Sequence, residues 1–194
     1  MTTYPPTQDR QGARERLLAA ADELFYAEGV HTVGIDRVIE RAGVAKATLY
    51  NTFGSKDELV RAYLSARQRT RQGRISATIA KQDDPREAIL AVFDLLDRVI
   101  AEPGYRGCAF LNASAESRPE ESVQSVCSAT RGWIRGVFAD LARRAGAAHP
   151  AELAAQLVLL YDGAMVSAQL DGNKAAARTA RVVAAAMVDA GSGQ

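Results

Sequence analysis

The chain lacks the features of a secreted, metal-binding or membrane protein. Only two of its 194 residues are cysteines, Cys108 and Cys127, and two thiols provide neither a disulfide framework nor a metal-binding set. No unbroken apolar stretch reaches 18 residues, so no membrane-spanning helix is expected. The first ten residues have no apolar core of the kind found in signal peptides. These absences predict a cytoplasmic protein.

Residues suited to catalysis are equally scarce. His31 and His149 are the only histidines, and neither has a local nucleophile or metal ligand beside it. There is no glycine-rich phosphate loop, and the carboxylates are dispersed over helix faces predicted to be solvated. We therefore expect no catalytic residues, no metal and no cofactor. An all-α enzyme with its site in residues 85–190 stays as an alternative.

The amino-acid composition favours helices, and the charged residues are distributed unevenly along the chain. Apolar residues make up 47 % of the chain and aromatic residues 6 %, with many alanines and few β-branched runs, which predicts an all-α fold of about nine helices. Residues 1–81 hold 13 basic against 9 acidic side chains, whereas residues 82–194 hold 11 against 14. The first part is thus the one that would attract nucleic acid.

A helix, a glycine turn and a second helix are predicted within residues 34–53. Apolar residues recur at helical spacing in the first helix, Gly43 follows its last turn, and a second apolar stripe comes after the glycine: Ile35, Val38, Ile39, Ala42, then Val44, Leu49 and Phe53. This pattern is typical of a helix-turn-helix, whose second helix enters the major groove of DNA. An αα-hairpin with a polar outer face would show the same spacing.

The outer face of the second helix suits contact with DNA. Two alanines, Ala45 and Ala47, make that surface shallow, so the helix can approach base edges, and Asn51 could read an adenine edge. Lys46, Thr48 and Tyr50 carry donors for phosphate oxygens, which position a protein on the duplex without reading its sequence.

Residues 12–60 resemble the N-terminal domain of the TetR family of bacterial transcriptional repressors. The resemblance is carried by short motifs at family spacing, namely Ala42-Gly43-Val44, Thr48-Leu49-Tyr50, Phe53 and Ser55-Lys56-Asp57. It implies that Lys56 contacts a phosphate. The departures are Ala45 for serine, Ala47 for glycine, Thr52 for histidine or tyrosine, and Val33 and Gly34 where hydroxyl residues are frequent. Thr32 is the candidate to replace those hydroxyls.

Two domains are expected, a DNA-binding domain at 10–80 and a ligand-binding and dimerisation domain at 81–190. Ser55 and Glu58 form a capping box that opens a long linking helix, and the four arginines on its polar face are predicted to be solvated: Arg67, Arg69, Arg71 and Arg74. Asp84, Pro85 and Glu87 mark the start of the next helix, again with a capping box.

The candidate ligand pocket is less sharply marked. Read as a helix, Cys108, Asn112 and Glu116 share one face, and this spacing resembles a TetR subgroup with members that sense electrophiles or small acids. Cys108 is then a sensing thiol, or alternatively a small buried hydrophobe. Asn112 and Glu116 either line the pocket or tie down neighbouring structure. Trp133 and Tyr161 are further pocket candidates, with core packing as the alternative.

The resemblance also implies partners. It predicts a homodimer through the helices at about 150–170 and 174–189, bound to double-stranded operator DNA and released by an unknown small-molecule effector. Repressor action is the expectation. The alternatives are a ligand-dependent activator of the same fold and an interaction module that has lost DNA binding.

Overall fold

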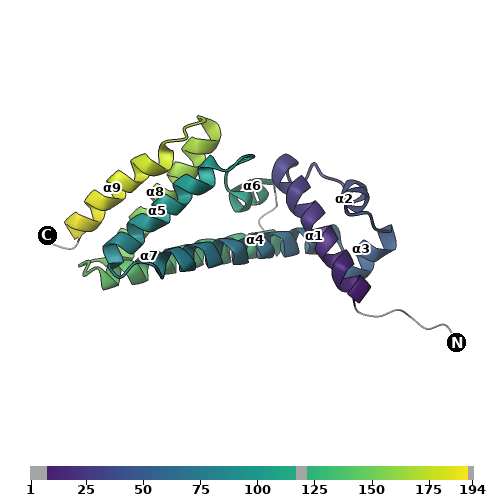
Figure 1. The fold of residues 1–194 in the computed structure, drawn as a ribbon, viewed down its shortest axis with the longest axis horizontal. Helices are drawn as coiled ribbons and strands as arrows, with labels where there is room; N and C mark the ends of the chain where they lie inside the picture. Colours follow the sequence, from purple (N-terminus) through teal and green to yellow (C-terminus); the bar gives the residue numbers. More distant parts are fainter. Residues whose placement is uncertain (1–7, 117–121, 192–194) are drawn as a thin grey trace. The chain divides into compact units, whose positions relative to one another are not determined.

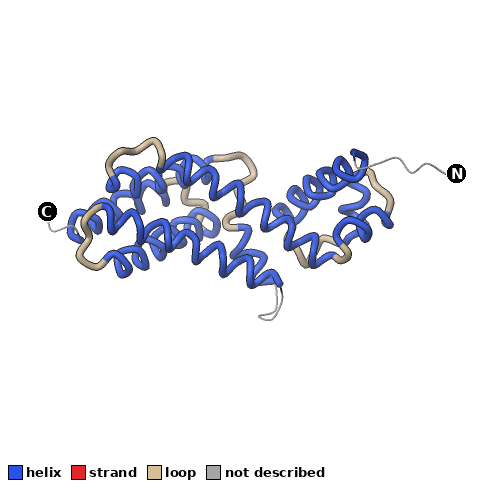
Figure 2. Tube along the Cα trace, turned by 90° about the horizontal axis from the view of Figure 1, so that it is seen from below, coloured by secondary structure: helices blue, strands red, loops and turns tan. Residues whose placement is uncertain are grey.

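The computed structural model describes residues 8–116 and 122–191, and in this part of the chain it contains nine helices and no strand (Figures 1 and 2). The all-α prediction is confirmed. The helices are α1 (Gln8–Glu28), α2 (Ile35–Ala42), α3 (Lys46–Phe53), α4 (Lys56–Ile79), α5 (Pro85–Ala101), α6 (Ala109–Glu116), α7 (Ser122–Arg144), α8 (Pro150–Leu170) and α9 (Ala176–Gly191).

The described residues pack into two compact units. Unit 1 contains the chain up to Arg67 together with Ala109–Cys127, and unit 2 contains Gln68–Cys108 and the chain from Ser128 onward. The sequence suggested a boundary at residue 81, where one helix gives way to the next. Packing divides the described residues inside α4 and places α6 in the unit that carries the helix-turn-helix, while the division at residue 81 into a DNA-binding and a ligand-binding domain stays a prediction.

Unit 1 is built by α1 packing on α2 and α3, with the start of α4 against α1. Its interior contains the side chains expected from the helical periodicity, among them Leu17, Phe25, Val38, Leu49 and Leu59. The glycine turn has the predicted geometry: Gly43 lies in the left-handed region at φ 63°, and its N–H donates to the Glu40 carbonyl at 3.2 Å. Ser55 caps α4 as predicted, because its Oγ accepts from the Glu58 N–H at 3.1 Å.

Two of the four arginines predicted to be solvated on α4, Arg67 and Arg71, turn inward instead. Arg67 donates through Nε and Nη2 to the two carboxylate oxygens of Asp22, at 2.6 and 3.0 Å. Its guanidinium carbon lies 3.8 Å from the centroid of the Tyr26 ring. Burial acts to lower the pKa of Arg67, but the hydrogen bond to Asp22 and the nearby tyrosines outweigh it, so the pKa is raised. Arg67 thus ties α4 to α1 within unit 1.

Unit 2 is a bundle in which α5, α8 and α9 pack on one another. Three aromatic rings meet in its core, with Phe93 stacked on Phe138 at 5.9 Å and both in edge contact with Tyr161 at 6.0 and 6.2 Å. By length and composition alone, α8 is apolar enough to cross a membrane. The sequence analysis did not indicate this, because polar residues interrupt the apolar run within α8. A buried core helix passes the same test, and α8 buries eight of its residues in unit 2.

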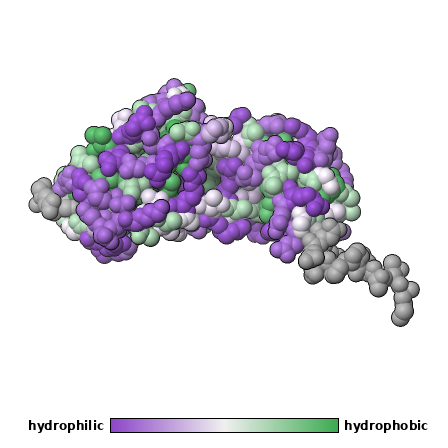
Figure 3. Space-filling model, viewed as in Figure 1, coloured by the Kyte–Doolittle hydropathy of each residue, from purple (hydrophilic) through white to green (hydrophobic). Residues whose placement is uncertain are grey.

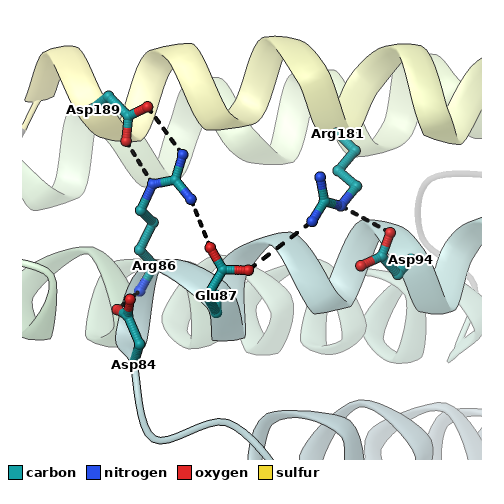
Figure 4. A network of polar contacts seen from close by, with 6 residues as sticks. All are labelled: Asp84, Arg86, Glu87, Asp94, Arg181 and Asp189. Carbon is teal, nitrogen blue, oxygen red and sulfur yellow. Dashed lines mark hydrogen bonds and ion pairs between the residues drawn. The ribbon is translucent and has the colours of Figure 1, made fainter.

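The start of α5 is also a polar junction with α9 (Figure 4). Asp84 caps the helix as predicted, accepting from the Arg86 N–H at 2.8 Å. Glu87 departs from the predicted capping box, because its carboxylate pairs with the side chains of Arg86 and Arg181. Arg86 also donates to Asp189, at 2.6 and 3.0 Å, and Arg181 to Asp94 at 2.8 Å. These pairs join α5 to α9 along the surface of unit 2.

Candidate DNA-binding interface

The recognition helix α3 presents most of the predicted DNA-binding residues to solvent. Leu49 is fully buried and holds the helix on unit 1, while Ala45, Lys46, Tyr50 and Asn51 are exposed. Thr48 is half-buried. Two predicted residues lie outside α3. Thr32 is exposed in the loop before α2. Lys56 is half-buried at the first position of α4, and its Nζ donates to the His31 carbonyl at 3.4 Å.

A groove between α1 and α3 extends this surface. Its volume is about 830 Å³. The lining residues come from α1, from the turn after α2 and from α3, and they are Gln11, Ala13, Arg14, Arg16, Gly43, Val44, Ala45, Thr48, Asn51 and Thr52. The guanidinium of Arg14 lies 5.5 Å from the Phe53 ring centroid, which restrains it beside α3. A groove with two arginines and several hydroxyl and amide groups has the chemistry of a phosphate-binding surface. Sequence reasoning did not single out Gln11.

Lys46 is engaged within the protein. Its Nζ lies 3.0 Å from Asp36 Oδ1, and both side chains are exposed, by 60 % and 82 % respectively. The hydrogen bond to Asp36 is the main reason that the pKa of Lys46 is raised. Lys46 therefore stays protonated at any physiological pH, and a DNA phosphate that approached it would have to compete with Asp36.

Removing this competitor is expected to tighten DNA binding. Asp36→Asn should increase affinity for any duplex about two- to threefold, because an exposed ion pair contributes little to folding yet occupies a cation that is predicted to bind phosphate. Titration of a labelled duplex by fluorescence anisotropy measures the change. Glu40→Gln on the same helix is the matched control, since it removes the same charge from α2. Equal effects of the two substitutions would contradict a specific role for the Asp36–Lys46 pair.

The predicted pocket residues are divided between the two units. Cys108 is half-buried and packs against the core of unit 2, as does Trp133, and Tyr161 lies within that core. Asn112 and Glu116 belong to α6 in unit 1. Glu116 is aimed at the loop after α1, where its Oε2 accepts from the His31 backbone N–H at 2.7 Å. This hydrogen bond joins α6 to that loop, although the two residues are 85 positions apart in sequence.

Comparison with known proteins agrees with this interface. Residues 17–63 match the family description "Bacterial regulatory proteins, tetR family". The chain is 33 % identical over 158 residues to the HTH-type transcriptional activator FasR of Mycolicibacterium smegmatis, covering 77 % of this chain and 67 % of FasR. The chain belongs to the TetR family.

Further transcriptional regulators resemble the chain over more than half of its length. A crystal structure of a TetR-family transcriptional regulator from Streptomyces coelicolor is 35 % identical with a TM-score of 0.90, covering 94 % of this chain and 97 % of that one. The HTH-type transcriptional regulator TtgR of Pseudomonas putida is 29 % identical, over 58 % of this chain and 59 % of TtgR. The protein is thus a DNA-binding transcriptional regulator of the TetR family, with its helix-turn-helix in α2 and α3.

Proposed function

We propose that this TetR-family protein is a cytoplasmic, homodimeric repressor that binds a palindromic operator and is released by a small-molecule effector. The observation that supports it best is the outer face of α3, where Ala45, Lys46, Tyr50 and Asn51 are exposed beside the groove lined by Arg14. Ala45 and Asn51 are proposed to read bases, and Lys46, Thr48, Tyr50, Lys56 and Thr32 to bind phosphates. No catalytic role is proposed for any residue.

Dimerisation is proposed through α8 and α9. These adjacent helices carry four of the six large hydrophobic side chains that are exposed among the described residues, with Leu159, Leu170 and Val182 exposed by 70, 76 and 70 % and Val183 by 44 %. Apolar patches also reach the surface of unit 2 in Figure 3. Exposed apolar side chains on neighbouring helices are typical of an interface between subunits. A two-fold dimer would place its two copies of α3 about one DNA turn apart, roughly 34–36 Å.

Selection of bound duplexes from a random library, followed by footprinting, tests the operator proposal. A palindrome with half-sites about one turn, roughly 10 base pairs, apart is the expected result. Lack of enrichment at low salt would contradict it. Transcription in vitro from a promoter containing the selected site then separates repression from activation, the alternative suggested by the similarity to the transcriptional activator FasR.

The number of bound phosphates can be obtained from salt dependence. Tyr50→Phe combined with Lys56→Ala should weaken binding to all sequences and flatten the plot of log affinity against log salt by about 0.9 for each phosphate that is no longer neutralised. Lys174→Ala removes an exposed lysine from unit 2 and serves as the control. An unchanged slope in the double variant would remove Lys56 from the phosphate contacts, and an unchanged affinity would remove Tyr50 as well.

A further inference from the structure

The outer face of α3 offers small apolar groups and an amide to DNA bases. Ala45 immediately precedes the helix, Ala47 lies in its first turn, and both are exposed. Asn51 is also exposed, and it follows Ala47 by four residues, so the two share one face of the helix. The first residues of a recognition helix are the ones that contact base edges. Two methyl groups and one amide are therefore placed for base readout.

These groups match the major-groove edge of an A·T pair. Thymine carries a methyl group there, and apolar side chains such as alanine contact it. Adenine presents the N7 acceptor beside the N6 amino donor, and an asparagine amide binds both through two hydrogen bonds. The amide of Asn51 forms no hydrogen bond in the part of the chain that the structure describes, so both of its ends are available to a base.

The same face is poorly equipped to read a G·C pair. Guanine is usually bound by arginine or lysine and cytosine by an acidic residue, and α3 contains no arginine and no acidic residue. Its one cation, Lys46, lies with Nζ 3.0 Å from Asp36 Oδ1. The guanine acceptors are uncharged, so they compete with a carboxylate for an ammonium group less well than a phosphate does. The hydroxyl of Tyr50 both donates and accepts, so its chemistry does not select one base pair.

The arginines around α3 are placed to bind other groups. α2 carries Arg37 and Arg41, and a glutamate of α1 binds each of them. Arg14 and Arg16 line the groove from α1, where the chemistry suits phosphate oxygens. The positive charge of this interface is thus separated from the two alanines and the asparagine that face the bases.

We propose that the operator half-site read by α3 is rich in A·T pairs, with a thymine methyl against Ala45 or Ala47 and an adenine bound by Asn51. This inference deepens the proposed function and rests on it, because it requires α3 to enter the major groove of an operator. Affinity then depends on the methyl group of thymine and on N7 of adenine, and each of these can be removed singly from synthetic DNA.

The test uses the full-length protein and the operator selected from the random library. Three duplexes are compared by fluorescence anisotropy. They are the operator itself, the operator with deoxyuridine for each half-site thymidine, and the operator with 7-deazadeoxyadenosine for each half-site deoxyadenosine. The variants are Ala45→Gly with Ala47→Gly, and Asn51→Ala. Ala19→Gly is the matched control, because Ala19 is exposed on α1 and does not line the groove.

The selected half-sites should contain more A·T than G·C pairs. Wild-type protein should bind the deoxyuridine duplex about fourfold more weakly than the operator for each buried methyl that is lost. It should bind the 7-deaza duplex about tenfold more weakly. The double alanine variant should lose the first difference, Asn51→Ala should lose the second, and Ala19→Gly should keep both. Ratios between duplexes are taken within one variant, so that a change in folding stability cancels.

Failure of this inference can be distinguished from failure of the proposed function. A selected operator with G·C-rich half-sites, wild-type affinity that ignores both base modifications, or variants that keep the wild-type ratios would overturn the A·T preference and leave operator binding intact. If a variant does not fold, the wild-type protein on the three duplexes decides. If no sequence is selected at all, the proposed function is refuted and this inference with it.

Discussion

Replacing Leu159 and Val182 together by glutamate is expected to make the protein monomeric and to weaken operator binding at least 100-fold. Both side chains are 70 % exposed, so in the isolated subunit the substitutions remove little packing and the fold should survive. In a dimer the same positions would bury four uncompensated carboxylates, which interfaces do not tolerate. A monomer has a single α3 and can occupy only one half-site. It therefore lacks the increase in affinity of about 10²–10⁴-fold that comes from binding two linked half-sites.

Analytical ultracentrifugation gives the mass in solution, and anisotropy with a two-half-site duplex gives the affinity. Leu111→Glu is the matched control, because Leu111 is 48 % exposed but lies on α6 in unit 1. It should leave the mass of a dimer unchanged. A Leu159→Glu, Val182→Glu variant that remains dimeric with wild-type affinity would show that the subunits associate through another surface.

Gly29→Ala is expected to destabilise unit 1 by about 2 kcal/mol and to weaken DNA binding by about tenfold or more. Gly29 ends α1 at φ 96°, a conformation that costs an L-residue about 1–2 kcal/mol. A Cβ at this position would also lie 2.7 Å from Oε1 of Glu116, so the Glu116 carboxylate must shift, which loosens its hydrogen bond to the His31 N–H and allows the loop to move. The loop between α1 and α2 carries Thr32 and the His31 carbonyl that holds Lys56, and its displacement disturbs both proposed phosphate contacts.

Two further variants separate strain from steric conflict. Gly34 lies in the same loop at φ −76° with open space around it, so Gly34→Ala should be nearly neutral. Adding Glu116→Ala to Gly29→Ala removes the close approach and should recover part of the stability, leaving the backbone strain. Thermal melting and operator titration of the set provide the measurements. If Gly34→Ala proved as harmful as Gly29→Ala, the effect would belong to loop flexibility and not to the contact with Glu116.

The sequence alone was sufficient to predict the helix-turn-helix, because every sequence signal behind that prediction is local. Val38 and Ala42 face inward by helical spacing, Gly43 takes the left-handed turn that only glycine adopts easily, and Ser55 caps the helix that begins one residue later. Each depends on neighbours within about four residues, a range over which backbone geometry fixes which side chains meet. The family resemblance covered the same region.

Tertiary packing alone decided the positions of the buried charges and the division into units. Arg67 and Arg71 look like surface residues in sequence, but their partners Asp22 and Tyr161 are 45 and 90 residues away on other helices. Glu116 shares a helical face with Asn112, yet it binds the His31 N–H, 85 residues distant. A buried charge is tolerated only where a specific distant group compensates it, and periodicity carries no information about such groups.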